Sequence, residues 1–132
     1  MKVLQSGVYN YQFSVQLTSA DTGSPRNATI WLKTVTNGVS ADVPYSTGIV
    51  AVPPKHGSVN GQIIAAWNYV LTLNANDALE LWWHGESTDL SIETIAAGTN
   101  PTHPITPSVI ATIQQVAAAV GGATGAIGAT GA

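Results

Sequence analysis

The feature that most constrains this chain is a strict alternation of apolar and polar side chains over residues 7–18. Every second residue from Tyr9 to Leu17 is apolar, and the residues between them are Asn, Gln or Ser. A period of two residues places the two kinds of side chain on opposite faces of a β-strand. The segment therefore predicts a half-buried strand, whose core-facing side chains are Tyr9, Tyr11, Phe13, Val15 and Leu17.

Several later segments also have the character of strands. Residues 28–36 are rich in β-branched and aromatic types, and the Asn37-Gly38 pair after them is a strong hairpin-turn signal. Further strands are expected over residues 39–43, 47–52, 62–73, 78–84, 89–96 and 108–116, with a proline-containing loop over 98–107. Short strands separated by turns, with no helical period before residue 115, predict an all-β fold, a sandwich or a barrel.

The strand predicted over residues 62–73 alternates, but both of its faces carry apolar side chains. Such a strand is expected to be buried on both sides or to face a partner subunit. Together with residues 78–84, it extends the expected core to Trp67, Tyr69, Leu79, Leu81 and Trp83. A subunit interface or contact surface is expected at Ile64, Val70, Trp82, Ile110 and Val116.

Charged residues make up only 8% of the chain, whereas about 25% is usual in soluble proteins. With four basic and seven acidic residues, the chain lacks the basic surface that binds nucleic acid. No run approaches the roughly 18 apolar residues of a membrane span, and the start is too short and polar for a signal peptide. The absence of cysteine excludes disulfides. A surface with so little charge favours coverage by copies of the same chain.

From residue 117 the composition changes, and glycine falls at every third position: Gly122, Gly125, Gly128 and Gly131. This is the period of a collagen triple helix, in which only glycine fits at the axis. A flexible Gly/Ala tail is the alternative interpretation. The chain is therefore divided into a β-sandwich domain over residues 1–116 and an Ala/Gly-rich, collagen-like tail over 117–132.

Few residues suggest chemistry. His84, Glu86 and Asp89 gather at a predicted strand end, where a metal or acid–base site competes with the favoured interpretation of a solvated turn. The tryptophans suit either a core or a surface that stacks on sugars, and Trp82 is the best candidate for an exposed contact. We predict no catalytic, metal or cofactor site, and we expect the chain not to be an enzyme.

A series of short motifs runs through residues 7–116. They are Gly7-Val8-Tyr9-Asn10-Tyr11-Gln12-Phe13-Ser14, Ile30-Trp31-Leu32, Val43-Pro44-Tyr45-Ser46, Ala65-Ala66-Trp67-Asn68-Tyr69, Leu79-Glu80-Leu81-Trp82-Trp83, and Pro107-Ser108-Val109-Ile110 running into Thr112-Ile113-Gln114-Gln115-Val116. Over these residues the chain resembles a domain that recurs in virion proteins of tailed phages. That family is similar to the jelly roll of complement globular heads and tumour necrosis factor, which forms tight trimers and often adjoins collagen-like repeats.

The resemblance implies a homotrimeric, non-enzymatic virion protein, made in the host cytoplasm and carried on the particle surface. A Met-initiated chain of this length favours a capsid decoration (cement) protein that clamps the major capsid protein or another virion protein. The alternative is a head- or tail-fibre domain that binds a receptor such as a host-surface glycan. The family has further strands before the position of Gly7. These strands come from another chain, or the sandwich is reduced, or the start is truncated.

Overall fold

The computed structural model describes residues 1–119, which form β-strands joined by turns and loops, without a helix. The all-β class predicted from the sequence is therefore confirmed for this part of the chain. The strands pair as antiparallel sheets and do not close into a barrel. The tail glycines, Gly122, Gly125, Gly128 and Gly131, lie outside the described residues.

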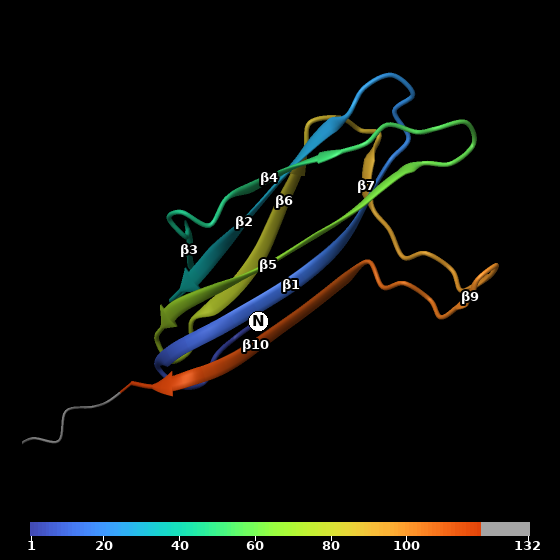
Figure 1. The fold of residues 1–132 in the computed structure, drawn as a ribbon. Helices are drawn as coiled ribbons and strands as arrows, with labels where there is room; N and C mark the ends of the chain where they lie inside the picture. The colour runs from blue at the N-terminus through green and yellow to red at the C-terminus, as the bar shows by residue number, and fades with distance from the viewer. Residues whose placement is uncertain (120–132) are drawn as a thin grey trace, which may run out of the picture.

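The first sheet is built around β1 (Gly7–Ser19), the strand with the cleanest alternation. On one side β1 pairs along its whole length with β5 (Gly61–Leu73). On its other side it pairs first with β10 (Val109–Ala118) and then with β7 (Leu90–Ile92). Strands from both ends of the chain therefore lie side by side in this sheet (Figure 1).

The second sheet is built around β2 (Arg26–Thr36). One edge of β2 pairs with β6 (Ala78–Gly85), and the other edge is shared by β4 (Gly48–Val52) and β3 (Val39–Asp42). The predicted turn between β2 and β3 is present, with positive φ angles of 50° at Asn37 and 78° at Gly38. Both residue types tolerate this conformation, which matches the twist of a tight hairpin.

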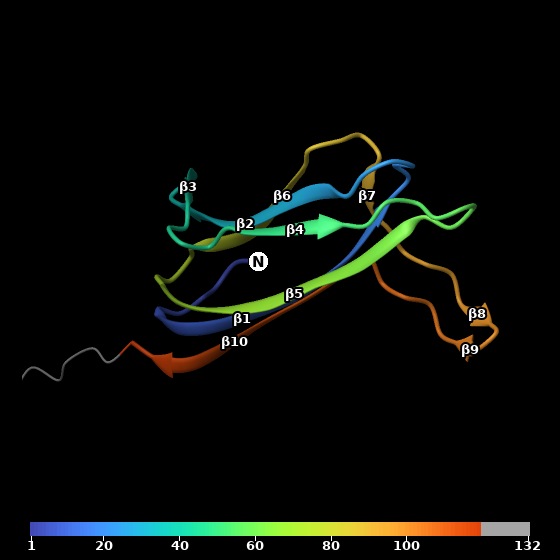
Figure 2. The same cartoon turned by 45° about the horizontal axis from the view of Figure 1, so that its top comes forward.

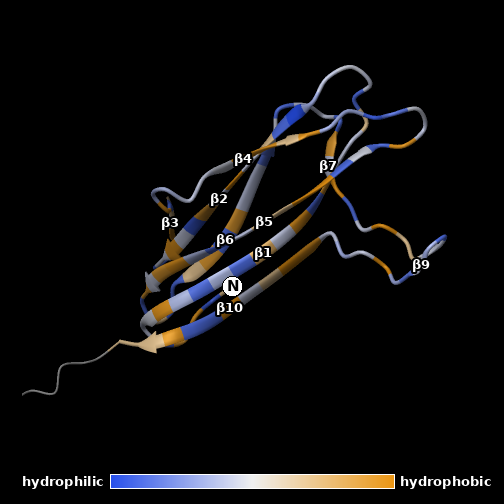
Figure 3. Cartoon of the chain, viewed as in Figure 1, coloured by the Kyte–Doolittle hydropathy of each residue, from blue (hydrophilic) through white to orange (hydrophobic). Residues whose placement is uncertain are grey.

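The two sheets lie face to face as the layers of a sandwich (Figure 2). Apolar and polar residues alternate along β1 as bands of colour in Figure 3, and the apolar set points into the core. Ser46, buried after β3, joins the layers: its hydroxyl accepts the N–H of Leu32 at 3.0 Å, and its carbonyl accepts the Tyr69 hydroxyl. The side chains with no exposed surface in this core are Leu17, Ala28, Ile30, Leu32 and Val52.

Most strand ends lie within two residues of the predicted ones, but two predicted segments differ more from the structure. The strand expected over 89–96 is limited to β7. The Glu93 N–H donates a hydrogen bond to the Gln16 carbonyl of β1 at 3.1 Å, and beyond this bond the chain leaves β1. The loop expected over 98–107 contains a small hairpin, β8 (Gly98–Thr99) with β9 (Thr102–His103). This hairpin projects from the sandwich as an arm (Figures 1 and 2).

Candidate functional site

Three exposed features carry the candidate functional residues. We call the outer surface of β10, β1 and β5 the neutral face, and the outer surface of β6, β2 and β3 the tryptophan face. The third feature, the edge slot, opens between the layers at the outer edges of β6 and β10, with which no strand pairs among the described residues.

The neutral face takes its name from its sequence: none of the three strands contains Asp, Glu, Lys, Arg or His. Four of the five residues predicted for an interface lie on these strands and are exposed. Their exposed fractions are 62% for Ile64, 66% for Val70, 54% for Ile110 and 53% for Val116. The face therefore combines apolar side chains with polar ones that carry no charge.

The strand register explains how these side chains are spread over the face. Residues opposite one another in antiparallel strands point to the same side of the sheet. Ile110 is opposite Ser14 of β1, and Ile64 is opposite Gln16. The β1 side chains thus form a central polar row with apolar side chains on both flanks. The side-chain amide of Asn68 on β5 donates to the side-chain oxygen of Asn10 in this row at 3.2 Å.

The arm gives the neutral face a raised border. Ile95 and Thr106 pair at its base, each donating its backbone N–H to the other's carbonyl, at 3.0 and 2.9 Å. A groove of about 510 Å³ separates the arm from the sheet, with Ile64 on one wall and Ile105 on the other. Ile105 is 60% exposed, so the arm adds apolar surface next to the face.

The tryptophan face presents two indoles, with the ring centroids of Trp31 and Trp82 6.2 Å apart. The Lys33 ammonium lies 4.7 Å from the Trp82 ring centroid and 3.2 Å from a carboxylate oxygen of Asp42. Both indole N–H groups donate to carboxylates, that of Trp31 to Asp42 at 3.0 Å and that of Trp82 to Glu80 at 2.8 Å. These bonds hold the rings in place, and Trp82 is 44% exposed. A fixed aromatic surface beside carboxylates can stack on the apolar side of a sugar ring.

The edge slot is an apolar cavity of about 280 Å³ between the layers. Its walls include Tyr11 and Val15 of β1, Leu81 and Trp83 of β6, Ile92 of β7 and Val109 of β10. Burial is the main cause that raises the pKa of the Tyr11 hydroxyl, and the neighbouring Tyr69 raises it further. The neutral phenol is therefore favoured there. Val109 is 41% exposed at the mouth of the slot.

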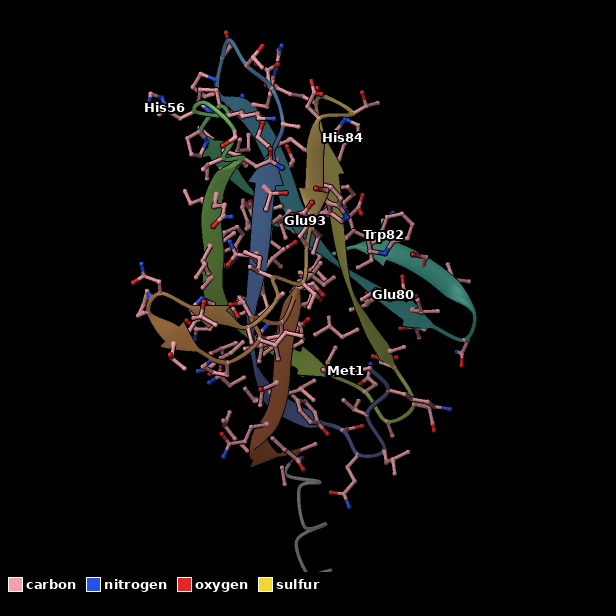
Figure 4. All side chains as sticks on the ribbon, turned by 90° about the vertical axis from the view of Figure 1, so that its right-hand side faces the viewer. Met1, His56, Glu80, Trp82, His84 and Glu93 are labelled. Carbon is pink, nitrogen blue, oxygen red and sulfur yellow. The ribbon has the colours of Figure 1, made fainter. Side chains whose placement is uncertain are left out.

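The chain's first residues lie at one end of the edge slot. The Met1 ammonium donates to the Leu79 carbonyl at 2.6 Å, and the Leu79 N–H donates to the Met1 carbonyl at 2.6 Å. Lys2 is opposite Ala78 in an antiparallel bridge. Figure 4 faces this side of the molecule, with Met1 between β6 and β10. The sequence pattern does not predict this pairing, because Met1 and Leu79 are 78 positions apart and the pairing is not a local property.

The structure buries most of the side chains that the alternation assigned to the core. Trp67, Tyr69 and Leu81 are half-buried against this core. The buried members of the predicted set are Tyr9, Tyr11, Phe13, Val15, Leu17 and Leu79.

Trp83 departs from the prediction, since 37% of its surface is exposed. Its side chain points to the inner face as expected, but it lines the edge slot, which no strand covers among the described residues. Alternation reports the face of a strand and not whether that face is covered, which is why the sequence assigned Trp83 to the core.

The cluster of His84, Glu86 and Asp89 has a structural role at the loop after β6. A Glu86 carboxylate oxygen accepts the backbone N–H of Asn27 at 2.7 Å, and the Ser87 hydroxyl donates to Asp89 at 3.0 Å. Within residues 1–119, no three His, Cys, Asp or Glu side chains converge on a point where a metal ion would fit.

The same described region contains no helix with the length and hydropathy needed to span a membrane. Neither the known protein-family models nor the curated proteins include a match to this chain.

Proposed function

We propose that this chain is a structural protein of a tailed-phage virion, a homotrimer that decorates the capsid and clamps neighbouring capsid subunits. The single observation that carries the proposal is the neutral face. Ile64 and Val70 of β5 and Ile110 of β10 are exposed there, and the three strands of the face contain no charged residue.

The energetics of such a surface favour association. Burying an exposed Val or Ile side chain contributes roughly 1.5–3 kcal/mol before the entropy of association is subtracted. A charged group would have to lose its hydration on burial, at a cost of several kcal/mol, and the strands of the neutral face have none. Amides and hydroxyls, such as those of Asn10 and Gln12, can exchange water for hydrogen bonds to a partner. Cyclic symmetry would close this contact without leaving a copy of the face uncovered.

The strand connections support a jelly-roll-like sandwich as the subunit of this trimer. In both sheets the central strand pairs with a strand that is distant in the sequence: β1 pairs with β5 and β10, and β2 pairs with β6. Long connections between paired antiparallel strands are typical of Greek-key and jelly-roll folds. The motif series over residues 7–116 resembles the phage family with this architecture.

The proposed partners are further copies of this chain and the major capsid protein or another virion protein on the particle surface. A formal net charge of −3 gives no electrostatic attraction to nucleic acid. The work of such a protein is mechanical, so it needs a rigid subunit and two contact surfaces, one for its own copies and one for the particle.

A specific observation favours the alternative function, a fibre domain that binds a host-surface glycan. On the tryptophan face, Trp31 and Trp82 are fixed by hydrogen bonds to carboxylates, an arrangement suited to stacking on sugar rings. In that case Trp82→Ala would abolish binding of the protein to host cells. Tyr45→Ala, which removes a fully exposed aromatic side chain elsewhere, is the control and would leave binding unchanged.

Copy number on purified particles distinguishes the two functions. A decoration protein is expected in hundreds of copies, in a fixed ratio to the major capsid protein, whereas a fibre domain is expected in few copies. Quantitative mass spectrometry of particles gives this ratio. Absence of the chain from the particles would contradict both functions.

A further inference from the structure

The free edge of β6 has a defined pattern of unpaired backbone groups. In an antiparallel strand, the N–H and C=O of one residue point to the same side, and those of the next residue point to the opposite side. Both groups of Leu79 bond Met1 across the free edge. The N–H and C=O groups of Leu81 and Trp83 therefore point to that same edge. Among the described residues, no strand pairs with β6 there beyond Met1.

The side chains of these same residues line the edge slot. Leu81 and Trp83 form one wall of the 280 Å³ cavity, and Val109 of β10 lies across it. An added strand would therefore find backbone partners on β6 and an apolar space beneath its inward side chains. Unpaired edges next to apolar surface are where proteins commonly accept a further strand.

We propose that β6 is an acceptor edge for an extended strand of another polypeptide. This strand runs antiparallel to β6, bonds the backbone of Leu81 and Trp83, and ends beside Met1. Its side chains opposite Leu81 and Trp83 are apolar and fill the edge slot, and the side chain between them is polar and faces outward.

One observation fixes the register of this partner. Residues 1 and 2 already pair with the start of the same edge, so the partner continues an existing antiparallel register rather than starting a new one. The inference does not depend on the proposed trimer, because the edge slot and the neutral face are different surfaces of the sandwich.

The test uses the full chain and the synthetic peptide acetyl-Ser-Val-Thr-Val-Thr with a free carboxylate. When its last Thr lies next to Met1, the two Val side chains are opposite Leu81 and Trp83. In an NMR titration, the amides of Leu81 and Trp83 should shift, and their hydrogen exchange should slow by about tenfold or more at saturation. The control peptide acetyl-Val-Thr-Val-Thr-Ser has the same composition but places Thr in the slot, and it should bind at least about tenfold more weakly.

A second variant shows where the peptide binds. Fusing Ser-Val-Thr-Val-Thr directly before Met1 should fill the edge from within the same chain, slow exchange at both amides and abolish binding of the free peptide. The proposal is overturned if the two peptides bind equally, if neither binds at millimolar concentration, or if the protected amides belong to β10. Concentration-dependent protection of Leu81 and Trp83 without peptide would assign the edge to a second copy of the chain, which also overturns it.

Discussion

The indole of Trp67 lies so close to Gly48 that a β-carbon on Gly48 would stand 2.5 Å from the ring atom Cζ2. This contact joins β5 of one layer to β4 of the other, on the side where the sandwich is closed. The indole ring has little freedom to move away from Gly48. It packs edge-on against the Phe13 ring, with the ring centroids 4.8 Å apart, and donates its N–H to the Tyr69 hydroxyl.

Gly48→Ala is therefore expected to destabilise the fold by about 1–3 kcal/mol, the usual cost of overpacking a core. Chemical denaturation monitored by circular dichroism gives this value. Gly23→Ala is the control, because its β-carbon would make only an ordinary contact of 3.8 Å with Asp21. Equal stability of the two variants would show that the layers are not in contact at Gly48.

Trp67→Ala is expected to cost about 3 kcal/mol or more, because it removes a large side chain that packs on Phe13 and leaves a cavity. The midpoint of thermal unfolding should fall accordingly. Tyr45→Ala removes a side chain that makes no core contact and should leave the midpoint nearly unchanged. A Trp67→Ala variant with unchanged thermal stability would contradict the assignment of this residue to the core.

The alternation of β1 and β5 shows what the sequence could predict. A period of two is a local property of the sequence. It therefore predicts that both segments are strands and that the side chains of Phe13 and Trp67 point inward. The open edge beside Trp83 could not be predicted, because cover depends on which distant strands pair, and that is a non-local property. The pairing of Met1 with Leu79 was missed for the same reason, since the residues are 78 positions apart.

The loop between β1 and β2 should be sensitive to acid. The N–H groups of Ser24 and Gly23 bond the Asp21 carboxylate, and Arg26 adds a hydrogen bond and its charge, so the pKa of Asp21 falls to about 2. A carboxyl group with a lowered pKa in the fold stabilises it above its unfolded pKa of about 4. That contribution is lost as the pH falls from about 4 toward 2.

Thermal unfolding measured at several pH values between about 5 and 2 records this loss. Asp21→Asn should lower stability near neutral pH and flatten the acid-dependent fall. Glu93→Gln, which changes a carboxylate outside this loop, should keep the fall seen in the parent chain. An acid response that is the same with and without Asp21 would contradict its role.

The neutral face can be disrupted without touching the core. Ile64→Glu places a charge on an outward position of β5, and burial of that charge at a subunit contact would cost several kcal/mol. The variant is expected to be folded and monomeric. Ile49→Glu on β4 is a matched control, because Ile49 is 67% exposed and Ile64 is 62% exposed, but Ile49 belongs to the other sheet. A variant Ile64→Glu that keeps the parent's assembly state would place the contact elsewhere.

The native mass of the purified full chain tests the central claim most directly, namely that copies of this protein associate through the neutral face. Native mass spectrometry or analytical ultracentrifugation at micromolar concentration is expected to give three times the 13.6 kDa of one chain. A single species of 13.6 kDa, unchanged by Ile64→Glu, would contradict the account.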